Sequence, residues 1–455
     1  MLKNFKIRYK QFTRAEEGSV ATIVGLGFLV LVGCIGVAVD IGRGQLVQTK
    51  LSSSLDAAGL AAASTVNTTN LVEDTHKYLN VNFRDYMGSK ITDVQISTND
   101  SNTIINISAS ATLPTTFMRI FGHETMNVSA SSEITRAVSG LELVLVLDNT
   151  GSMAGTRLSQ LKTAAKDLVN ILFGDNLDND KLWIGLVPFA QAVNIGPSRT
   201  SWIDVADKNA KNWGPAGSTW WGCVDARLNG HDVTDEPPGT QKFKAYYWPD
   251  DSNNDWIQNN GKYKTLSINL GPNKNCSQEV LPMTNDKEAI KDAIDNMTAV
   301  GYTHVNLGAV WGWRMLSPKW RGLWGGDMDA NNLPLDYNTQ RMNKAAIIMT
   351  DGENTVSDSI RSAYWYPSDG RLGTTNTSTA KKRLDDRLSQ VCTSMKDNNI
   401  IVYTIAFGNP GSTVKNLMRN CATHPDYYFD SPSGDELQAA FRAIGDSLSN
   451  LRVSK

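Results

Sequence analysis

The longest uninterrupted apolar run lies near the N-terminus, at residues 19–39, and reads SVATIVGLGFLVLVGCIGVAV. It contains no charged residue, and as a helix rising about 1.5 Å per residue it would span about 30 Å, enough to cross a bilayer core. Several basic residues precede it and fewer follow it; those before it are Lys3, Lys6, Arg8, Lys10 and Arg14. The positive-inside rule therefore predicts a single-pass helix with residues 1–18 in the cytoplasm and the rest of the chain outside.

Three other interpretations of this run are open. As a cleaved secretory signal, the run is longer than usual and lacks a clean small-x-small site after it. As a lipoprotein signal, residues 31–34 have the form of a lipobox, but apolar residues continue past Cys34. As a pilin-type leader, Gly18 precedes an apolar helix, but Ile23 stands where pilins carry Glu. All three keep most of the chain outside the cytoplasm.

Residues 40–137 are predicted to form a pilin-like helix and a small β region. Apolar residues recur near helical spacing up to about residue 68, so the helix should continue out of the membrane; they are Leu46, Leu51, Leu55, Ala58 and Leu60. Segments 94–97 and 104–111 alternate between apolar and polar residues on either side of a turn-like stretch, which predicts a β-hairpin. Residues 126–130 add a further strand.

Residues 138–455 show short apolar runs separated by helical patterns. The runs lie at 141–147, 182–187, 345–349 and 400–407, and the helical patterns at 157–173, 287–297, 305–316, 380–397 and 435–451. Buried strands that alternate with helices predict an α/β fold with a doubly wound, mostly parallel sheet.

Two polar stretches, 196–283 and 317–342, interrupt this alternation and are predicted to be surface insertions. The first is too long for a structureless loop in a compact domain, so it should have a small core of its own. It holds half of the 12 tryptophans, namely Trp202, Trp213, Trp220, Trp221, Trp248 and Trp256. These tryptophans are equally compatible with that core and with a binding face.

Composition narrows the class of protein. The chain has 455 residues and a formal net charge of −2, without a basic stripe, so nucleic-acid binding is not expected. It contains no Gly-x-Ser-x-Gly, His-Glu-x-x-His or P-loop motif, so we do not expect an enzyme. Four cysteines lie in the later part of an exported chain, which suits two disulfides with three possible pairings; they are Cys223, Cys276, Cys392 and Cys421.

Acidic residues follow two of the apolar runs directly, at Asp148 and Asp351. Ligands of open α/β sheets bind beyond the carboxyl ends of the strands, so these two carboxylates should converge. Thr150 and Ser152 add hydroxyls on a tight loop that Gly151 allows to turn. Oxygen ligands without His or Cys select hard cations, with Mg²⁺ first and Mn²⁺ or Ca²⁺ as alternatives. One position would stay open for a carboxylate from a partner protein.

These residues resemble the metal-ion-dependent adhesion site of von Willebrand factor A domains. The Asp-x-Ser-x-Ser motif of that family matches Asp148–Ser152, with Thr150 where Ser is usual, and its last aspartate matches Asp351. The resemblance adds Thr303 as the distant threonine. His304, beside it, is expected to be structural rather than a ligand.

The wider chain resembles TadG-like proteins of the tight-adherence (Flp) pilus assembly system. The resemblance is carried by the segments 17–21, 39–43, 55–63, 221–224, 281–284, 311–314 and 421–423. It implies an inner-membrane anchor, a periplasmic metal-binding domain, and pairing of Cys223 with Cys276 and of Cys392 with Cys421. The predicted function is Tad/Flp pilus assembly or adhesion, with pilus or envelope proteins as partners. The alternative is a pilin-like structural subunit in which the metal only stabilises the fold.

Overall fold

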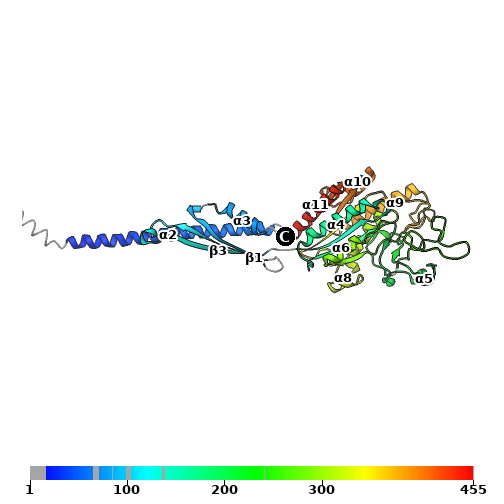
Figure 1. Cartoon of the computed structure of the whole chain (residues 1–455), viewed down its shortest axis with the longest axis horizontal. Helices are drawn as coiled ribbons and strands as arrows, with labels where there is room; N and C mark the ends of the chain where they lie inside the picture. Colours follow the sequence, from blue (N-terminus) through cyan, green and yellow to red (C-terminus); the bar gives the residue numbers. More distant parts are fainter. Residues whose placement is uncertain are drawn as a thin grey trace, which may run out of the picture. The chain divides into compact units, whose positions relative to one another are not determined.

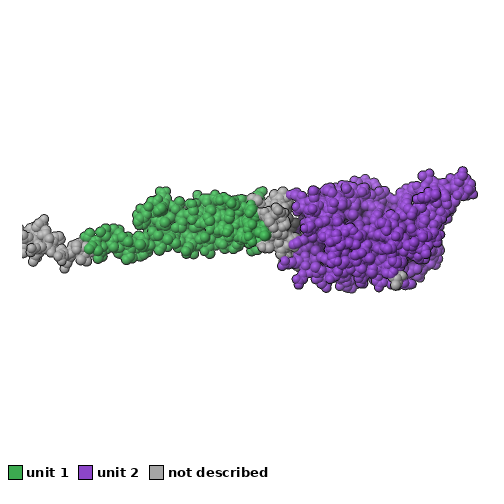
Figure 2. Space-filling view, turned by 90° about the horizontal axis from the view of Figure 1, so that it is seen from below, with its two compact units in different colours: residues 1–137 green, residues 138–455 purple. Residues whose placement is uncertain are grey.

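The computed structural model describes residues 17–64, 71–84, 86–98, 104–135, 139–239 and 241–453. The chain divides into two compact units, residues 1–137 and 138–455 (Figures 1 and 2). Residues 1–16, which carry the basic residues used for the predicted orientation, lie outside the described residues. The expectation of a mixed α/β protein with an apolar N-terminal helix is confirmed.

Unit 1 is built on one continuous 48-residue helix, α2 (Glu17–Ser64), which contains the whole apolar run. Within the described residues it is the one helix long and apolar enough to cross a membrane. Beyond the run, Val47, Leu51 and Leu55 are fully buried. The helix continues beyond the run to Ser64, and Leu46 and Leu60, which are 51% and 65% exposed, lie on the side of α2 that the rest of the unit does not cover.

A three-stranded antiparallel sheet packs against the second half of α2. Its strands are β1 (Lys90–Thr98), β2 (Ile104–Pro114) and β3 (Thr125–Thr135), in that order. Alternate residues of β2 are buried in one core with α2, from Ile105 to Leu113. The same core includes Leu79 of a short helix that the sequence pattern missed, α3 (Leu71–Asn82). A single turn, η2 (Tyr86–Gly88), precedes β1. A second, η3 (Met118–Phe121), lies in the connection between β2 and β3.

Unit 2 contains a six-stranded sheet in the order β11-β10-β9-β4-β5-β8. The strands are β4 (Gly140–Asp148), β5 (Leu182–Phe189), β8 (Leu281–Thr284), β9 (Met342–Thr350), β10 (Ile400–Phe407) and β11 (Tyr428–Ser431). All neighbours are parallel except β5 and β8. The four predicted strands are present; β8 and β11 were missed because each edge strand has only four residues.

Helices cover both faces of this sheet. The side chains of β4 show this directly, because Leu143 and Leu145 belong to one hydrophobic core and Val144 and Val146 to the other. The first core includes residues from α4 (Thr156–Phe173), α6 (Lys287–Asp295) and α11 (Gly434–Val453). The second includes residues from α7 (Val305–Leu316), α9 (Thr377–Asp397) and α10 (Ser412–Cys421).

The long insertion has a core continuous with the second of these clusters. Its short elements are η5 (Thr200–Trp202), α5 (Val205–Asn209), η6 (His231–Val233) and β7 (Cys223–Val224), which pairs with β6 (Val193–Asn194). Four of its six tryptophans are buried, namely Trp202, Trp220, Trp248 and Trp256. Trp202 packs against Trp320 and Trp324 of the second insertion, which contains η7 (Pro318–Trp320) and α8 (Gly326–Ala330). Most of these tryptophans therefore serve as core rather than as a binding face.

Two disulfides brace unit 2. Cys223 is bonded to Cys276 within the long insertion, and Cys392 of α9 is bonded to Cys421 at the end of α10. This is the pairing that the family resemblance implied. Cys34, in the apolar part of α2, is a free and exposed thiol.

Candidate metal centre

The two aspartates singled out by the sequence lie at the same edge of the unit 2 sheet. Strands β4 and β9 are adjacent and parallel, with Leu147 opposite Met349. Asp148 is the last residue of β4, and Asp351 is the first residue after β9. Parallel register therefore brings two carboxylates from distant parts of the sequence to one point.

Backbone hydrogen bonds tie a third loop to this edge. The Val300 N–H donates to the Asn149 carbonyl (2.9 Å), and the Gly151 N–H donates to the Gly301 carbonyl (3.0 Å). Gly301 has φ +69°, and a Cβ there would lie 2.4 Å from Gln191 Oε1, so only glycine fits this crossing. The loop continues into Thr303, whose carbonyl accepts from the N–H of Thr355 after β9 (2.9 Å).

All five predicted ligands meet in one hydrogen-bonded network. Asp148 Oδ1 accepts from the N–H and the hydroxyl of Thr150, at 2.9 and 2.6 Å. The Thr150 and Ser152 hydroxyl oxygens are 3.0 Å apart, and Ser152 donates to Asp351 Oδ1 at 2.6 Å. Thr303 donates to the Thr150 hydroxyl at 3.3 Å. Two carboxylates and three hydroxyls thus share one small space.

Burial makes this arrangement electrostatically costly. The side chains of Asp148 and Asp351 are both 0% exposed. Burial, followed by the nearby charge of Asp351, raises the pKa of Asp148 to about 6, although bonds from Thr150 and Thr350 oppose the rise. Arg157, at the start of α4, donates to Asp351 Oδ2 at 2.8 Å and supplies one compensating charge.

The donor set fits a hard divalent cation. It offers oxygen atoms only, and two adjacent carboxylates are poorly balanced by the single contacting guanidinium of Arg157. Among the described residues, including those of this site, no group of three or more His, Cys, Asp or Glu side chains is placed to hold a metal. A cation at this edge would therefore depend on hydroxyl ligands as well as carboxylates.

Three residues around the network were not found by the sequence analysis. Thr350 donates to Asp148 Oδ2 at 2.7 Å, and its place directly before Asp351 was an available signal. Arg157 carries no motif that distinguishes it from other helix-terminal arginines. Gln191 is fully buried and accepts from the Tyr302 N–H at 3.0 Å, so it supports the Thr303 loop from the segment between β5 and β6.

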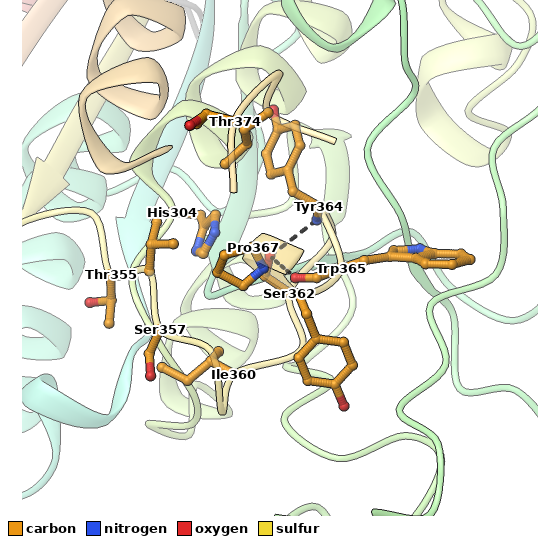
Figure 3. Close-up of a pocket in the computed structure, with 12 residues that line it drawn as sticks. His304, Thr355, Ser357, Ile360, Ser362, Tyr364, Trp365, Pro367 and Thr374 are labelled. Carbon is orange, nitrogen blue, oxygen red and sulfur yellow. Dashed lines mark hydrogen bonds between the residues drawn. The ribbon is translucent and has the colours of Figure 1, made fainter. Parts of the chain in front are cut away.

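His304 lines a pocket together with Thr355 and Tyr364 (Figure 3). Including the solvent at its mouth, the pocket has a volume of about 300 Å³, and its lining includes Ser362 and Tyr364. The imidazole is buried and stacks on Tyr364, with ring centroids 6.2 Å apart. Burial lowers the pKa of His304 to about 3, so the ring is neutral at physiological pH. Its position suits the structural role expected for it.

Replacing Arg157 with glutamine should tighten binding of a divalent cation at this edge. The guanidinium of Arg157 contacts Asp351 and would repel a divalent cation bound beside it. Because Arg157 is 44% exposed, solvent screens its charge and keeps this repulsion small. We therefore expect an affinity gain of about two- to fivefold, measured by calorimetric titration with Mg²⁺ or Mn²⁺. Lys415→Gln, which removes a surface ion pair with Asp430, is the control. An unchanged or weaker affinity in Arg157→Gln would contradict this role.

With this geometry described, the chain can be compared with known proteins. Residues 18–65 match the family described as Flp pilus-assembly TadE/G-like. The N-terminal segment is TadE/G-like. The matched residues are those of α2, from the start of the apolar run to just beyond the end of the helix. The sequence-based identification of a TadE/G-like N-terminal segment is confirmed.

No curated protein matches the chain. Among solved structures, the von Willebrand factor domain of the type V pili tip protein Mfa5 from Porphyromonas gingivalis is similar at 12% identity and a TM-score of 0.37, over 70% of this chain and 97% of that one. The pilus adhesin SpaC from Lactobacillus rhamnosus GG is similar at 14% identity and a TM-score of 0.36, over 79% of this chain.

A third similar structure is proximal thread matrix protein 1 from the mussel byssus, with a zinc-occupied MIDAS motif, at 13% identity and a TM-score of 0.33. It matches 70% of this chain. The chain spans 34% of the length of SpaC and 47% of the length of the byssus protein. At these TM-scores the likeness does not by itself establish a shared fold.

Proposed function

We propose that this protein is a membrane-anchored periplasmic factor of Tad/Flp pilus assembly or adhesion, which binds protein partners through a metal-ion-dependent adhesion site. The observation that carries the proposal is the network of Asp148, Thr150, Ser152, Thr303 and Asp351 at one sheet edge. The TadE/G-like segment at residues 18–65 supports the connection with pili. Its role is binding rather than catalysis.

The five oxygen-bearing side chains would hold the cation, with Mg²⁺ proposed first and Mn²⁺ or Ca²⁺ as alternatives. When bound, the cation supplies positive charge that balances the two buried carboxylates and attracts an acidic group from a partner. The hydroxyls of Thr150 and Ser152, which donate to the carboxylates here, would turn their lone pairs toward it. Arg157, at the rim and partly exposed, adds a second positive group facing an acidic ligand.

The arrangement of unit 2 supports a von Willebrand factor A-like, doubly wound domain with insertions at 196–283 and 317–342. Following the chain, β4, β5 and β8 are added toward one edge of the sheet, and β9, β10 and β11 are added toward the other edge. The strand order therefore reverses between β4 and β9. Asp148 and Asp351 lie at the carboxyl ends of these two strands. Ligands of such sheets bind at the point where the strand order reverses.

The two disulfides and the apolar half of α2 support the proposed localisation. Disulfides persist in oxidising compartments such as the periplasm, and both bonds lie in unit 2. The apolar residues 19–39 would span the inner membrane, with residues 1–18 in the cytoplasm and residues 40–455 in the periplasm.

Crosslinking in the native envelope tests the binding function. The parent chain should form crosslinked adducts with pilus or envelope proteins that disappear when Mg²⁺ is chelated. Asp148→Ala should lose the same adducts while remaining in the membrane fraction at parental levels. Adducts that resist both chelation and the substitution would refute metal-dependent binding.

A structural pilin-like subunit is the second candidate, because α2 is a single helix whose first half is exposed and whose second half packs on a sheet. Such a helix would also pack into the interior of a filament. Shearing and fractionation separate the two functions. Recovery of the chain in sheared filaments would favour the subunit, and retention in the inner membrane would favour the assembly factor.

A further inference from the structure

We propose that the loop between β2 and β3 is a second membrane-contacting element, which inserts beside α2 into the leaflet nearest the unit 1 sheet. This loop, residues 115–124, contains η3 and is called the β2–β3 loop below. The proposal rests on the membrane anchor of the proposed function but not on the metal centre. In this proposal, lipid contacts the apolar side chains of the β2–β3 loop that the rest of unit 1 leaves exposed.

The β2–β3 loop exposes large apolar side chains at its tip. Ile120 is 76% exposed and Phe121 is 61% exposed, and Phe117 is 37% exposed. Elsewhere on β2 and β3 the outward-facing residues are chiefly Ser, Thr and Asn, such as Ser110 and Asn127. The apolar residues are therefore concentrated at one end of the sheet, and this end contacts the apolar part of α2.

The contacts with α2 place the loop within the apolar run. Gly36 approaches Phe117 so closely that a Cβ there would lie 2.7 Å from the Phe117 Cβ, and a Cβ on Gly33 would lie 3.2 Å from the Phe121 ring. The run ends at Val39, so at about 1.5 Å per residue these contacts lie about 4.5–9 Å inside its end. Interfacial elements insert their apolar face to a similar depth, about 5–10 Å.

Asp40, directly after the run, holds the loop in place. Its carboxylate is 1% exposed and accepts hydrogen bonds from the N–H groups of Thr116, Phe117 and Met118, at 2.9, 2.7 and 2.7 Å. Arg43, one turn further, pairs with the same carboxylate. These bonds pair three N–H groups of the loop at the level where the apolar run ends, which lowers the cost of bringing the tip beyond them into lipid.

Lipid suits this surface better than a second copy of the chain. The tip approaches α2 at Gly33 and Gly36, within a run whose apolar side chains, such as Leu29 and Ile35, are also exposed. Three partly exposed side chains, of about 150–250 Å² each when whole, fall well short of the roughly 800 Å² per partner in a stable protein interface. Arg119, also exposed, stands between them where it can meet headgroup phosphates.

Site-directed spin labelling tests the proposal on the full chain in nanodiscs of phosphatidylethanolamine and phosphatidylglycerol. The reporter is a nitroxide at Ile120→Cys in a Cys34→Ser background, whose other cysteines are held in disulfides. Oxygen concentrates in lipid, whereas a nickel complex stays in water. The ratio of oxygen accessibility to nickel accessibility should be at least fivefold higher for this label than for a control label. That control is Leu60→Cys, an apolar position of α2 far from the run that is 65% exposed.

A spin label on native Cys34 tests the membrane anchor independently of the loop insertion. A lipid-exposed label at Cys34 together with a water-exposed label at Ile120 would leave the anchor standing and overturn the loop insertion. Strong dipolar broadening at Ile120 between neighbouring chains, without oxygen access, would also overturn it in favour of a protein–protein contact. Water exposure at both positions would overturn the anchor and the insertion together.

A matched pair of glycine variants tests the docking contact. Gly36→Leu should push the loop away from α2 and reduce the oxygen access of the Ile120 label by at least half, because the added side chain collides with Phe117. Gly27→Leu places the same side chain in the same apolar run where nothing lies within 4 Å, and should leave the label unchanged. Equal effects of the two variants, or no effect of either, would refute the docking geometry.

Discussion

Replacing Asp148 with asparagine should stabilise the metal-free chain at pH 7 and abolish its stabilisation by Mg²⁺. The reason is that Asp148 is fully buried beside a second carboxylate, which raises its pKa from 3.8 to about 6. A shift of about 2 units corresponds to a penalty of up to about 3 kcal/mol when the carboxylate is ionised. Asparagine keeps a similar shape without the charge, but it cannot balance a dication.

The stability difference between Asp148→Asn and the parent should depend on pH in one direction. The carboxyl of Asp148 has a higher pKa in the folded chain than in the unfolded chain, so the penalty is absent below about pH 4, where both are protonated. It should grow as pH rises toward about 6 and stay constant above that. The stability difference between Asp148→Asn and the parent, measured in chelator, should follow the same course.

The measurement is the free energy of unfolding of the full chain in detergent, from pH 4 to 8, with chelator or with Mg²⁺. Asp358→Asn, at an exposed position seven residues after Asp351, is the control and should change neither the metal-free stability nor the metal response. A parental response to Mg²⁺ in Asp148→Asn would remove Asp148 from the proposed ligands. Lower metal-free stability at pH 7 would contradict the electrostatic account.

Replacing Lys344 with methionine should cost about 3–5 kcal/mol, because it would leave a buried carboxylate without its partner. Lys344 of β9 and Glu142 of β4 form an ion pair between neighbouring central strands, with side chains 1% and 0% exposed. Glu142 also accepts from the Leu335 N–H at 2.8 Å, and Lys344 donates to the Leu316 carbonyl at 3.0 Å. Burial raises the pKa of Glu142 and lowers that of Lys344, and their attraction opposes both shifts.

A double variant shows whether the cost comes from the stranded charge. Glu142→Gln together with Lys344→Met removes both charges and keeps an acceptor for the Leu335 N–H, so it should recover most of the lost stability in chemical denaturation. The single variant should also lose less at pH 4.5 than at pH 7, since protonation neutralises Glu142. If the double variant is as unstable as Lys344→Met, the loss reflects packing rather than charge.

Local sequence patterns were sufficient for the long, strongly patterned elements. The central strands are continuous apolar runs because both of their faces are buried, α7 is buried along its whole length, and α9 has a regular apolar face. The short edge strands β8 and β11 carry no such signal, because four residues can pair at an edge without a distinctive period. In α2, helical spacing identified a helix but did not show which side is buried: Leu51 and Leu55 are buried, whereas Leu46 and Leu60 are exposed.

For the candidate site, the sequence predicted residues whose chemistry shows in their type and place along the chain. Two aspartates after apolar strands, hydroxyls on a tight loop, and a resemblance that added Thr303 were enough to name the five side chains. The sequence did not indicate Arg157, Gln191 or Thr350, because these act through contacts with residues up to 202 positions away.

By itself, then, the sequence determined the apolar helix, the central strands and the residue types at the sheet edge, since each depends on neighbours within a few positions. Only the tertiary structure decided which hydrogen bonds and charges surround Asp148, and that Asp40 holds a loop 76 to 78 residues away. The physical reason is that periodicity records whether a residue is buried, whereas electrostatics and docking depend on which distant residue it is buried against.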